Sequence, residues 1–375
     1  MTISTALRSI LAMVALLAIS ACATLQSRQQ VPPQLVAEAT IHADQRLRYW
    51  GDDNEFARIQ AQVAPGPDGD VDYLTLSGGG INGAYGAGFL VGWTDKGGRP
   101  EFEVVTGISV GAMIAPMAFL GSDYDARLRT VFSSLTQKDN SAGANFLGAL
   151  FGAPSVMSNV PVLDAIRKLV DTQALNAIGV EHKQGRRLYV GTTNLNAQRP
   201  MIWDIGAIAI SNLPNRLELV HQIILASTAV PGVFPPVMLD VAAQGMSFDE
   251  LHVDGGVTEQ VLLMPGGYEA FVKNRSGVQK LYVIFNGVVA PSPATVQISS
   301  MSLLERAVPT LLKYLGRSNL EQLDNAARKA GLAFRLTAIP ADFPESTSVF
   351  GSPQWLSALY QYGYQAGRNG RWQSR

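Results

Sequence analysis

The sequence has one cysteine, few charged side chains and almost no net charge, and each shortage excludes a class of protein. One cysteine cannot form a disulfide within the chain. Lysine and arginine total 29 against 30 for aspartate and glutamate, so no basic field exists to attract nucleic acid, and no nucleic-acid partner is expected. Only 16% of the 375 residues are charged and 47% are hydrophobic, which excludes a mainly disordered chain and suits one large domain or two small ones.

The chain also has little that suits a membrane span, because its N-terminal apolar segment is short. Arg8 precedes the run "ILAMVALLAIS" from Ile10 to Ser20, which fits the core of an export signal better than a span. Ile19 to Cys22 resemble the lipobox of bacterial lipoproteins, whose cysteine is lipid-modified and becomes the mature N-terminus. Residues 1–21 are therefore predicted to be a lipoprotein signal peptide and Cys22 the lipidation site. An ordinary signal peptide with an incidental cysteine is the alternative.

The residue after the predicted lipidation site bears on the membrane address. Ala23 is not the acidic residue that often marks retention in the inner membrane. An exported, periplasm-facing lipoprotein is expected, and the outer membrane is favoured over the inner one.

The rest of the chain divides at a turn-rich stretch from Pro65 to Asp70. Residues 22–70 are predicted to be a tether with a peripheral helix around Ala43 to Val63. Three alternating aspartates near the boundary resemble a calcium loop, but the glycine and glutamate that such a loop needs are missing, so no metal site is predicted. Residues 71–375 are predicted to be one hydrolase domain, with a motif-bearing core over about 72–267 and a C-terminal extension over about 268–375.

Short apolar strands alternate with helices after the boundary, which predicts an α/β sandwich around a largely buried sheet. The predicted strands are Val71 to Leu76, Phe102 to Val105, Arg187 to Thr192, Leu251 to Val253, Leu281 to Phe285 and Phe334 to Ile339. The predicted helices are Gly83 to Trp93, Ala112 to Phe119, Val162 to Val170, Arg216 to Ser227, Met301 to Ala330 with a break near Gly316, and Pro353 to Arg368.

A glycine-rich loop follows the first of these strands. Gly78, Gly80 and Gly83 form a G-x-G-x-x-G pattern, which offers outward-facing backbone N–H groups to a negative charge. One hypothesis is a dinucleotide pyrophosphate, for which Glu101 or Glu103 would be the ribose-binding acid. The other is an oxyanion formed in acyl transfer, and the loop alone does not decide between them.

A serine motif follows about thirty residues later. Gly107-Ile108-Ser109-Val110-Gly111 lies between an apolar strand and an apolar helix, the context of a nucleophile elbow, in which Gly107 and Gly111 make room for the turn. The serine needs a base. His42, His182, His221 and His252 are the only histidines, and none follows His252, so the usual serine–acid–histidine order is hard to complete. Asp254, which follows a strand and precedes Gly255 and Gly256, is the other candidate base.

Four ordered motifs carry a family resemblance. "SGGGINGAYGAG", "GISVG", "ASTAVPGVFPPV" (Ala226 to Val237) and "VDGG" (Val253 to Gly256) resemble the patatin-like phospholipase family over about residues 72–267. The resemblance implies a patatin-like three-layer α/β/α sandwich around a mainly parallel central sheet. It also implies a Ser–Asp dyad without a histidine, carried by Ser109 as nucleophile and Asp254 as base, with Gly78, Gly79 and Gly80 as the oxyanion hole.

Two positions depart from the family pattern. Ser77 stands where the family often has aspartate, and Asn82 where it often has a basic residue that steadies the glycine loop. The substitution at Asn82 is expected to weaken the oxyanion hole or to alter substrate choice.

Two further segments have alternative interpretations. The apolar run from Phe146 to Met157 is a mobile lid, a patch that enters the lipid interface, or plain packing. His252 is either a partner of Asp254 or a proton shuttle, or else a hydrogen-bonded histidine at a strand end.

The sequence therefore predicts an exported, lipid-anchored serine acyl hydrolase of phospholipase A or lysophospholipase type. Its expected partners are phospholipid or lysophospholipid acyl esters and a membrane reached through the lipid anchor, and no metal or cofactor is expected. The alternatives are an acyltransferase that uses the same acyl-enzyme and a catalytically weak lipid-binding lipoprotein. Head group, acyl position and oligomeric state are left open.

Overall fold

The computed structural model describes residues 29–41, 47–53, 63–133, 158–262, 277–346 and 351–373. The chain divides into two compact units, one of Met1–Ala43 with Asp240–Glu250 and one of Asp44–Leu239 with Leu251–Arg375. The first unit contains a 3-10 turn at Pro33–Leu35 and a small apolar cluster of Val31, Ala39, Val241, Ala243 and Phe248. In this unit the backbone of Thr40 also bonds to that of Ala242.

The strands of the structure are β1 (Arg48–Trp50), β2 (Val71–Leu76), β3 (Val104–Ile108), β4 (Arg187–Asn194), β5 (Arg199–Asp204), β6 (Val237–Ala243), β7 (Met246–Asp254), β8 (Gln279–Val288) and β9 (Ala333–Ile339). The α-helices are α3 (Gly83–Lys96), α4 (Val110–Leu120), α5 (Asp125–Ser133), α7 (Val160–Leu169), α8 (Thr172–Lys183), α9 (Ile205–Ile210), α10 (Arg216–Ser227), α12 (Ser300–Ala330) and α13 (Pro353–Arg368). Short 3-10 turns include η2 (Gly80–Asn82) and η5 (Gly255–Val257).

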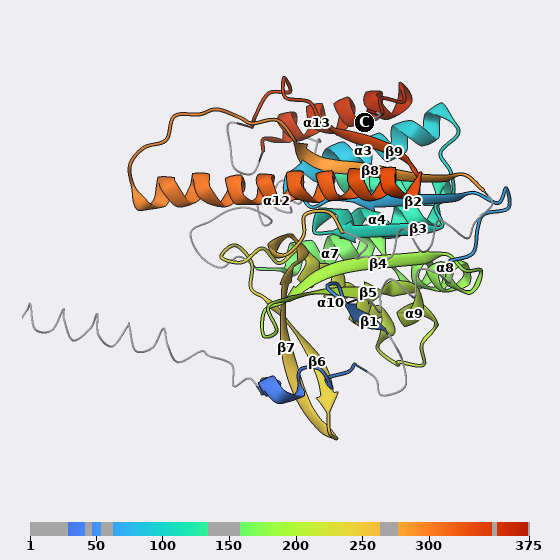
Figure 1. Ribbon diagram of the computed structural model, residues 1–375, viewed down its shortest axis with the longest axis vertical. Helices are drawn as coiled ribbons and strands as arrows, with labels where there is room; N and C mark the ends of the chain where they lie inside the picture. The colour runs from blue at the N-terminus through green and yellow to red at the C-terminus, as the bar shows by residue number, and fades with distance from the viewer. Residues whose placement is uncertain are drawn as a thin grey trace, which may run out of the picture. The chain divides into compact units, whose positions relative to one another are not determined.

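The central sheet of the second unit is mixed, and its strands are mostly parallel (Figure 1). Its order is β1-β5-β4-β3-β2-β8-β9, and β7 also pairs with β4. Neighbouring strands from β4 to β9 along this order run parallel, whereas β1, β5 and β7 pair antiparallel. Every residue of β2 is buried, as expected of a central parallel strand covered on both faces. The predicted α/β sandwich with a mainly parallel sheet is thereby confirmed.

The two faces of the sheet are covered by different helices. Leu281 and Val283 of β8 belong to the apolar core that includes Leu320 and Leu323 of α12. Between them Tyr282, which points to the opposite face, contacts the ring of Trp93 on α3 at 5.1 Å. Helices α3 and α12 therefore lie on opposite faces and form the outer layers.

Helix α12 is continuous over its 31 residues, so the predicted break near Gly316 is wrong. A Cβ at Gly316 would lie 2.9 Å from the ring of Phe285, so this glycine permits close packing on β8. Ser299 caps the first turn, and Gly331 with φ of 73° ends the helix. The predicted peripheral helix is also wrong where the structure describes it, because Arg48–Trp50 forms β1, paired with β5.

The last helix, α13, lies against α3 through glycines on both helices. A Cβ on Gly88 of α3 would meet the backbone of Tyr360, and one on Gly92 would meet that of Tyr364. A Cβ on Gly363 of α13 would meet the backbone of Tyr85. The two backbones therefore approach as closely as only glycine allows.

Replacing Gly363 by alanine is expected to destabilise the protein, because the new Cβ would meet the carbonyl oxygen of Tyr85. The free energy of unfolding should fall by about 1–3 kcal/mol, the usual cost of overpacking, in urea denaturation of the full chain. Gly179→Ala in α8 is the control, because its nearest neighbour is the side-chain methyl Ile210 Cγ2 at 3.2 Å, which can move. A loss no larger than that of the control would contradict the packing argument.

Candidate active site

Ser109 is the single residue between the end of β3 and the start of α4. Its φ of 55° and ψ of −125° are rare for a residue with a side chain, and such strain is typical of functional turns. Glycines permit the turn, since a Cβ on Gly107 would meet the backbone of Gly111, and one on Gly111 would meet that of Leu76. The amide of Ser109 donates to Ser227 Oγ at 2.9 Å, which fixes the turn from α10.

The hydroxyl of Ser109 faces Asp254. Ser109 Oγ donates to Asp254 Oδ2 at 2.7 Å, although 145 positions separate the two residues in the chain. Asp254 is the last residue of β7 and lies opposite Thr192 of β4. Its Oδ1 accepts the amide of Gly256 at 2.7 Å, and Gly255 begins the η5 turn. Both members of the pair are buried.

Burial controls the ionisation of Asp254. Removal from water raises the pKa of this carboxyl to about 7, while the hydrogen bonds from Ser109 and the Gly256 amide oppose the rise. The carboxyl therefore changes its charge close to neutral pH, where a group that accepts and returns a proton works best.

The three glycines of the predicted oxyanion hole differ in their bonding. Gly78 donates its amide to the carbonyl oxygen of Gln260 at 3.0 Å, so this donor is engaged. Gly79 and Gly80 have φ of 150° and 56°, and the described residues provide no acceptor for either amide. A Cβ on Gly78 would lie 3.4 Å from Ser109 Cβ, so the loop borders the serine. Two of the three predicted donors thus remain open beside Ser109.

Asn286 of β8 holds the glycine loop in place. Its backbone amide donates to Ser77 Oγ at 2.7 Å and its Nδ2 to the carbonyl of Ser77 at 2.9 Å. Its Oδ1 accepts the amide of Gly86 at 3.1 Å. Gly79 packs so closely on Asn286 that a Cβ would meet its carbonyl oxygen. Ser77, one of the two departures from the family pattern, is therefore part of this brace.

Sequence reasoning did not find Ser227, Gln260 or Asn286. Ser227 also donates to the carbonyl of Gly191 at 2.6 Å and so links α10, β4 and the serine turn. Gln260 receives its own support from Asn319 of α12, whose Oδ1 accepts the Gln260 amide at 2.9 Å. Only Ser227 stands in a sequence motif, the "ASTAVPG" stretch, that could have drawn attention to it.

His252 lies on β7, two residues before Asp254. Thr192 Oγ1 accepts a hydrogen bond from Trp203 Nε1 at 2.8 Å and lies 3.0 Å from His252 Nδ1. The His252 ring also contacts the Trp203 ring edge to face at 5.5 Å. These contacts describe a hydrogen-bonded histidine in the core of the sheet, the second of the two sequence interpretations.

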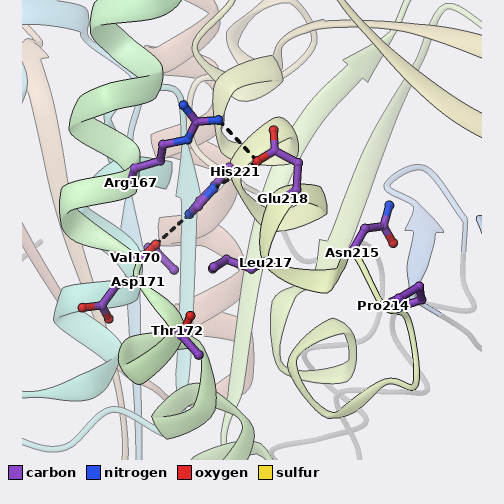
Figure 2. A pocket seen from close by; sticks show the side chains of 9 residues that line it. All are labelled: Arg167, Val170, Asp171, Thr172, Pro214, Asn215, Leu217, Glu218 and His221. Carbon is purple, nitrogen blue, oxygen red and sulfur yellow. Dashed lines mark hydrogen bonds and ion pairs between the residues drawn. The ribbon is translucent and has the colours of Figure 1, made fainter.

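The other described histidines lie in structural positions. His221 Nε2 bonds to the carbonyl of Val170 at 2.7 Å, in a pocket of about 500 Å³ between α7, α8 and α10 (Figure 2). No residue of that pocket belongs to the predicted site. His182 lies on α8, 3.5 Å from Asp204 Oδ1.

The dinucleotide hypothesis finds no support in the position of Glu103. Its carboxylate accepts the amide of Asp72 at 2.6 Å, beside the start of β3 and away from the end that carries Ser109. Within the described ranges, no group of three or more histidine, cysteine, aspartate or glutamate side chains is arranged to hold a metal ion.

Several predicted features lie outside the described residues. They are Cys22, His42 and the segment from Phe146 to Met157, which was a candidate lid. Among the helices of the described residues, none combines the length and apolar character that crossing a bilayer requires.

A serine at a strand–helix turn, facing a buried carboxylate and a glycine loop, is typical of serine hydrolases. The chain matches the profile of the patatin-like phospholipase family over residues 74–265, and it belongs to this family. Family membership supports lipid acyl hydrolysis in general and implies lipid substrates.

Two solved structures resemble the fold distantly. VipD from Legionella pneumophila is 12% identical, with a TM-score of 0.37, and the likeness covers 83% of this chain and 68% of VipD. The type III effector protein ExoU is 13% identical, with a TM-score of 0.35, and the likeness covers 82% of this chain and 54% of ExoU. Comparison with curated proteins gave no match. Because both TM-scores are low, the family membership rests on the sequence match.

Replacing Asp254 by asparagine is expected to stabilise the protein at alkaline pH. Because burial raises the pKa of Asp254 from 3.8 to about 7, the folded state keeps a proton that the unfolded state releases between these values. Wild-type stability should therefore fall as pH rises from about 4 to about 7, and Asp254→Asn should lack this contribution. Urea denaturation at pH 5 and pH 8 measures it, with exposed Asp342→Asn as control. An advantage of Asp254→Asn that does not grow with pH would contradict the assignment.

Proposed function

We propose that the chain is an exported, lipid-anchored serine acyl hydrolase of phospholipase A or lysophospholipase type that uses a Ser109–Asp254 dyad. The observation that carries the proposal is the 2.7 Å hydrogen bond from Ser109 Oγ to Asp254 Oδ2. A buried hydroxyl bonded to a buried carboxylate is the arrangement that a base needs to take the serine proton.

The reaction begins when ionised Asp254 accepts the proton of Ser109 and Oγ attacks the ester carbonyl carbon. Negative charge then forms on the carbonyl oxygen, and the open amides of Gly79 and Gly80 stabilise it, each by about 3 kcal/mol if they act as such donors do elsewhere. Protonated Asp254 returns the proton to the leaving alcohol as the ester bond breaks, which leaves an acyl group on Ser109.

Water completes the cycle by the same steps, with water as the attacking group and Ser109 as the leaving group. Asp254 accepts a proton from water, the hydroxide attacks the acyl carbonyl, and the fatty acid leaves as Ser109 regains its proton. The chain's own groups supply every proton transfer.

Ser109→Ala and Asp254→Asn should each abolish ester hydrolysis, because one removes the nucleophile and the other removes the base. We expect losses of at least about a thousandfold in kcat for a short-chain phospholipid, as when a member of a catalytic unit is removed. Wild-type protein should react with a fluorophosphonate probe, and Ser109→Ala should not.

Matched controls separate chemistry from folding. Ser211→Ala and Asp204→Asn change a buried serine and a buried aspartate that lie on other contacts, at the end and the start of α9. Both should keep most of the activity. Full hydrolysis by Ser109→Ala would refute the mechanism, and an unlabelled wild type that retains lipid would favour the lipid-binding alternative.

The lipid anchor is a separate part of the proposal, supported by the lipobox-like residues that end at Cys22. In a bacterium with two membranes, the full chain should carry acyl groups on Cys22 and sediment with the outer membrane. Cys22→Ser should lose the modification, detected by mass spectrometry of the N-terminal peptide, whereas Thr24→Ala should keep it. Cleavage without lipid in the wild type would overturn the anchor and leave the hydrolase proposal intact.

A further inference from the structure

A second cavity lies at the same edge of the sheet as Ser109. It has a volume of about 370 Å³, and its lining includes Gly79 and Asn82 from the glycine loop. Another part of its wall is formed by Val288 and Ile339, the last residues of β8 and β9. Helix α12 contributes Lys313. Ligands of parallel sheets bind at the carboxyl ends of the strands, so this cavity is where a substrate is expected to extend.

Lys313 bonds two neutral oxygens at this cavity. Its Nζ donates to the carbonyl of Ala290 at 3.1 Å and to Ser292 Oγ at 2.8 Å. Both are neutral oxygens, and they use two of the three donors of the ammonium. Among the described residues no carboxylate forms an ion pair with Lys313. The ammonium therefore retains one donor, and Glu345, which also lines the cavity, acts on its charge without forming an ion pair with it.

Charges of both signs act on Lys313. Burial lowers the pKa of its ammonium, the charge of Glu345 opposes this, and Arg306 and Arg317 add to the lowering. Two further cations of the same helix thus act on Lys313, against the exposed carboxylate of Glu345. An anion in the cavity would relieve their mutual repulsion.

The rest of the lining suits an amphipathic molecule. Ile81, Phe343 and Trp355 offer apolar surface beside the polar groups of Asn82 and Ser292. The rings of Phe343 and Trp355 meet edge to face at 5.9 Å, so this wall is packed.

Helix α12 is tied to the glycine loop through Gln260. Asn319 of α12 accepts the Gln260 amide at 2.9 Å, and the Gln260 carbonyl accepts the Gly78 amide at 3.0 Å. Lys313 lies six positions before Asn319 on the same continuous helix. The position of its charge is therefore set relative to the loop that borders Ser109.

We propose that this cavity is a head-group subsite in which Lys313 binds the phosphate of a glycerophospholipid while its ester lies at Ser109. The inference rests on the proposed function and narrows its substrate class to phosphodiester-bearing lipids over neutral acylglycerols. Lys313 also supplies a positive charge to the cavity that Asn82 lines, and Asn82 stands where the family often has a basic residue. The side chain enters from α12, outside the range of residues 74–265 that the family profile covers.

The test compares two substrates that differ in the phosphate. Wild type and Lys313→Met are assayed with dihexanoylphosphatidylcholine and with dihexanoylglycerol, both as monomers in solution. The ratio of kcat/KM for the phospholipid over the neutral ester should fall about tenfold in Lys313→Met, mainly through KM, as expected for losing one charge-assisted hydrogen bond. Lys329→Met, an exposed lysine near the end of α12, should leave the ratio unchanged. An equal loss on both substrates, or no loss on either, would overturn the proposal.

A binding measurement separates this proposal from the proposed function. Calorimetric titration of the Ser109→Ala protein with dihexanoylphosphatidylcholine should show binding that Lys313→Met weakens about tenfold. Inorganic phosphate should bind far more weakly, because it lacks the apolar contacts; equal affinity for both would replace the head-group subsite by a free-phosphate site. If the wild type hydrolyses no ester but this binding is seen, the subsite stands and the hydrolase does not. If the wild type hydrolyses the ester but Lys313→Met binds the phospholipid as tightly as the protein with Lys313 does, the hydrolase stands and the subsite does not.

Discussion

The candidate active site depends on the antiparallel pairing of β7 with β4 inside a mainly parallel sheet. Parallel order brings the ends of β2 and β3, and with them the glycine loop and Ser109, to one edge. The carboxylate has to come from far along the chain, and the register that sets Asp254 opposite Thr192 places it there. A slip of one residue would turn the Asp254 side chain to the other face of the sheet. The topology therefore has to position Asp254, the proposed base, whereas the position of Ser109, the proposed nucleophile, follows from its local turn.

The burial that positions the pair also gives Asp254 its chemistry. An ordinary aspartate is too weak a base to take a proton from serine at neutral pH, whereas a histidine has a suitable pKa without help. Burial brings the pKa of Asp254 to about 7, into the range of an imidazole. The raised pKa of Asp254 is consistent with a site that needs no histidine base, in which His252 packs on Trp203 and bonds with Thr192. The cost is a folded state that holds a charged, buried carboxylate above neutral pH.

Local sequence signals predicted many of the helices and strands and the Ser109 and Asp254 side chains of the candidate site. The bounds of β2, α10 and α13 agree with the predicted ones, because each has strong periodicity and clear ends, such as the Ser352 cap and Pro353 at the start of α13. The strand β5 was missed because it begins with Arg-Pro, which locally indicates a loop. Gln260 and Asn286 could not be found from sequence, because they act through a backbone carbonyl and an amide that only the tertiary fold brings to the glycine loop.

The C-terminal third of the chain has no catalytic motif, yet it determines the shape of the site. The family profile ends at residue 265, while Asn286 and Asn319, which brace the glycine loop directly and through Gln260, lie beyond it. The glycine loop that contains Asn82 therefore depends on side chains far beyond it in the chain. An electrostatic interaction depends on the distance between charges and on the medium, not on their order in the chain. In the proposed head-group subsite, Lys313 of α12 supplies the positive charge that is absent from the loop, so substrate choice would change with the helix that covers the sheet while the proposed dyad stays the same.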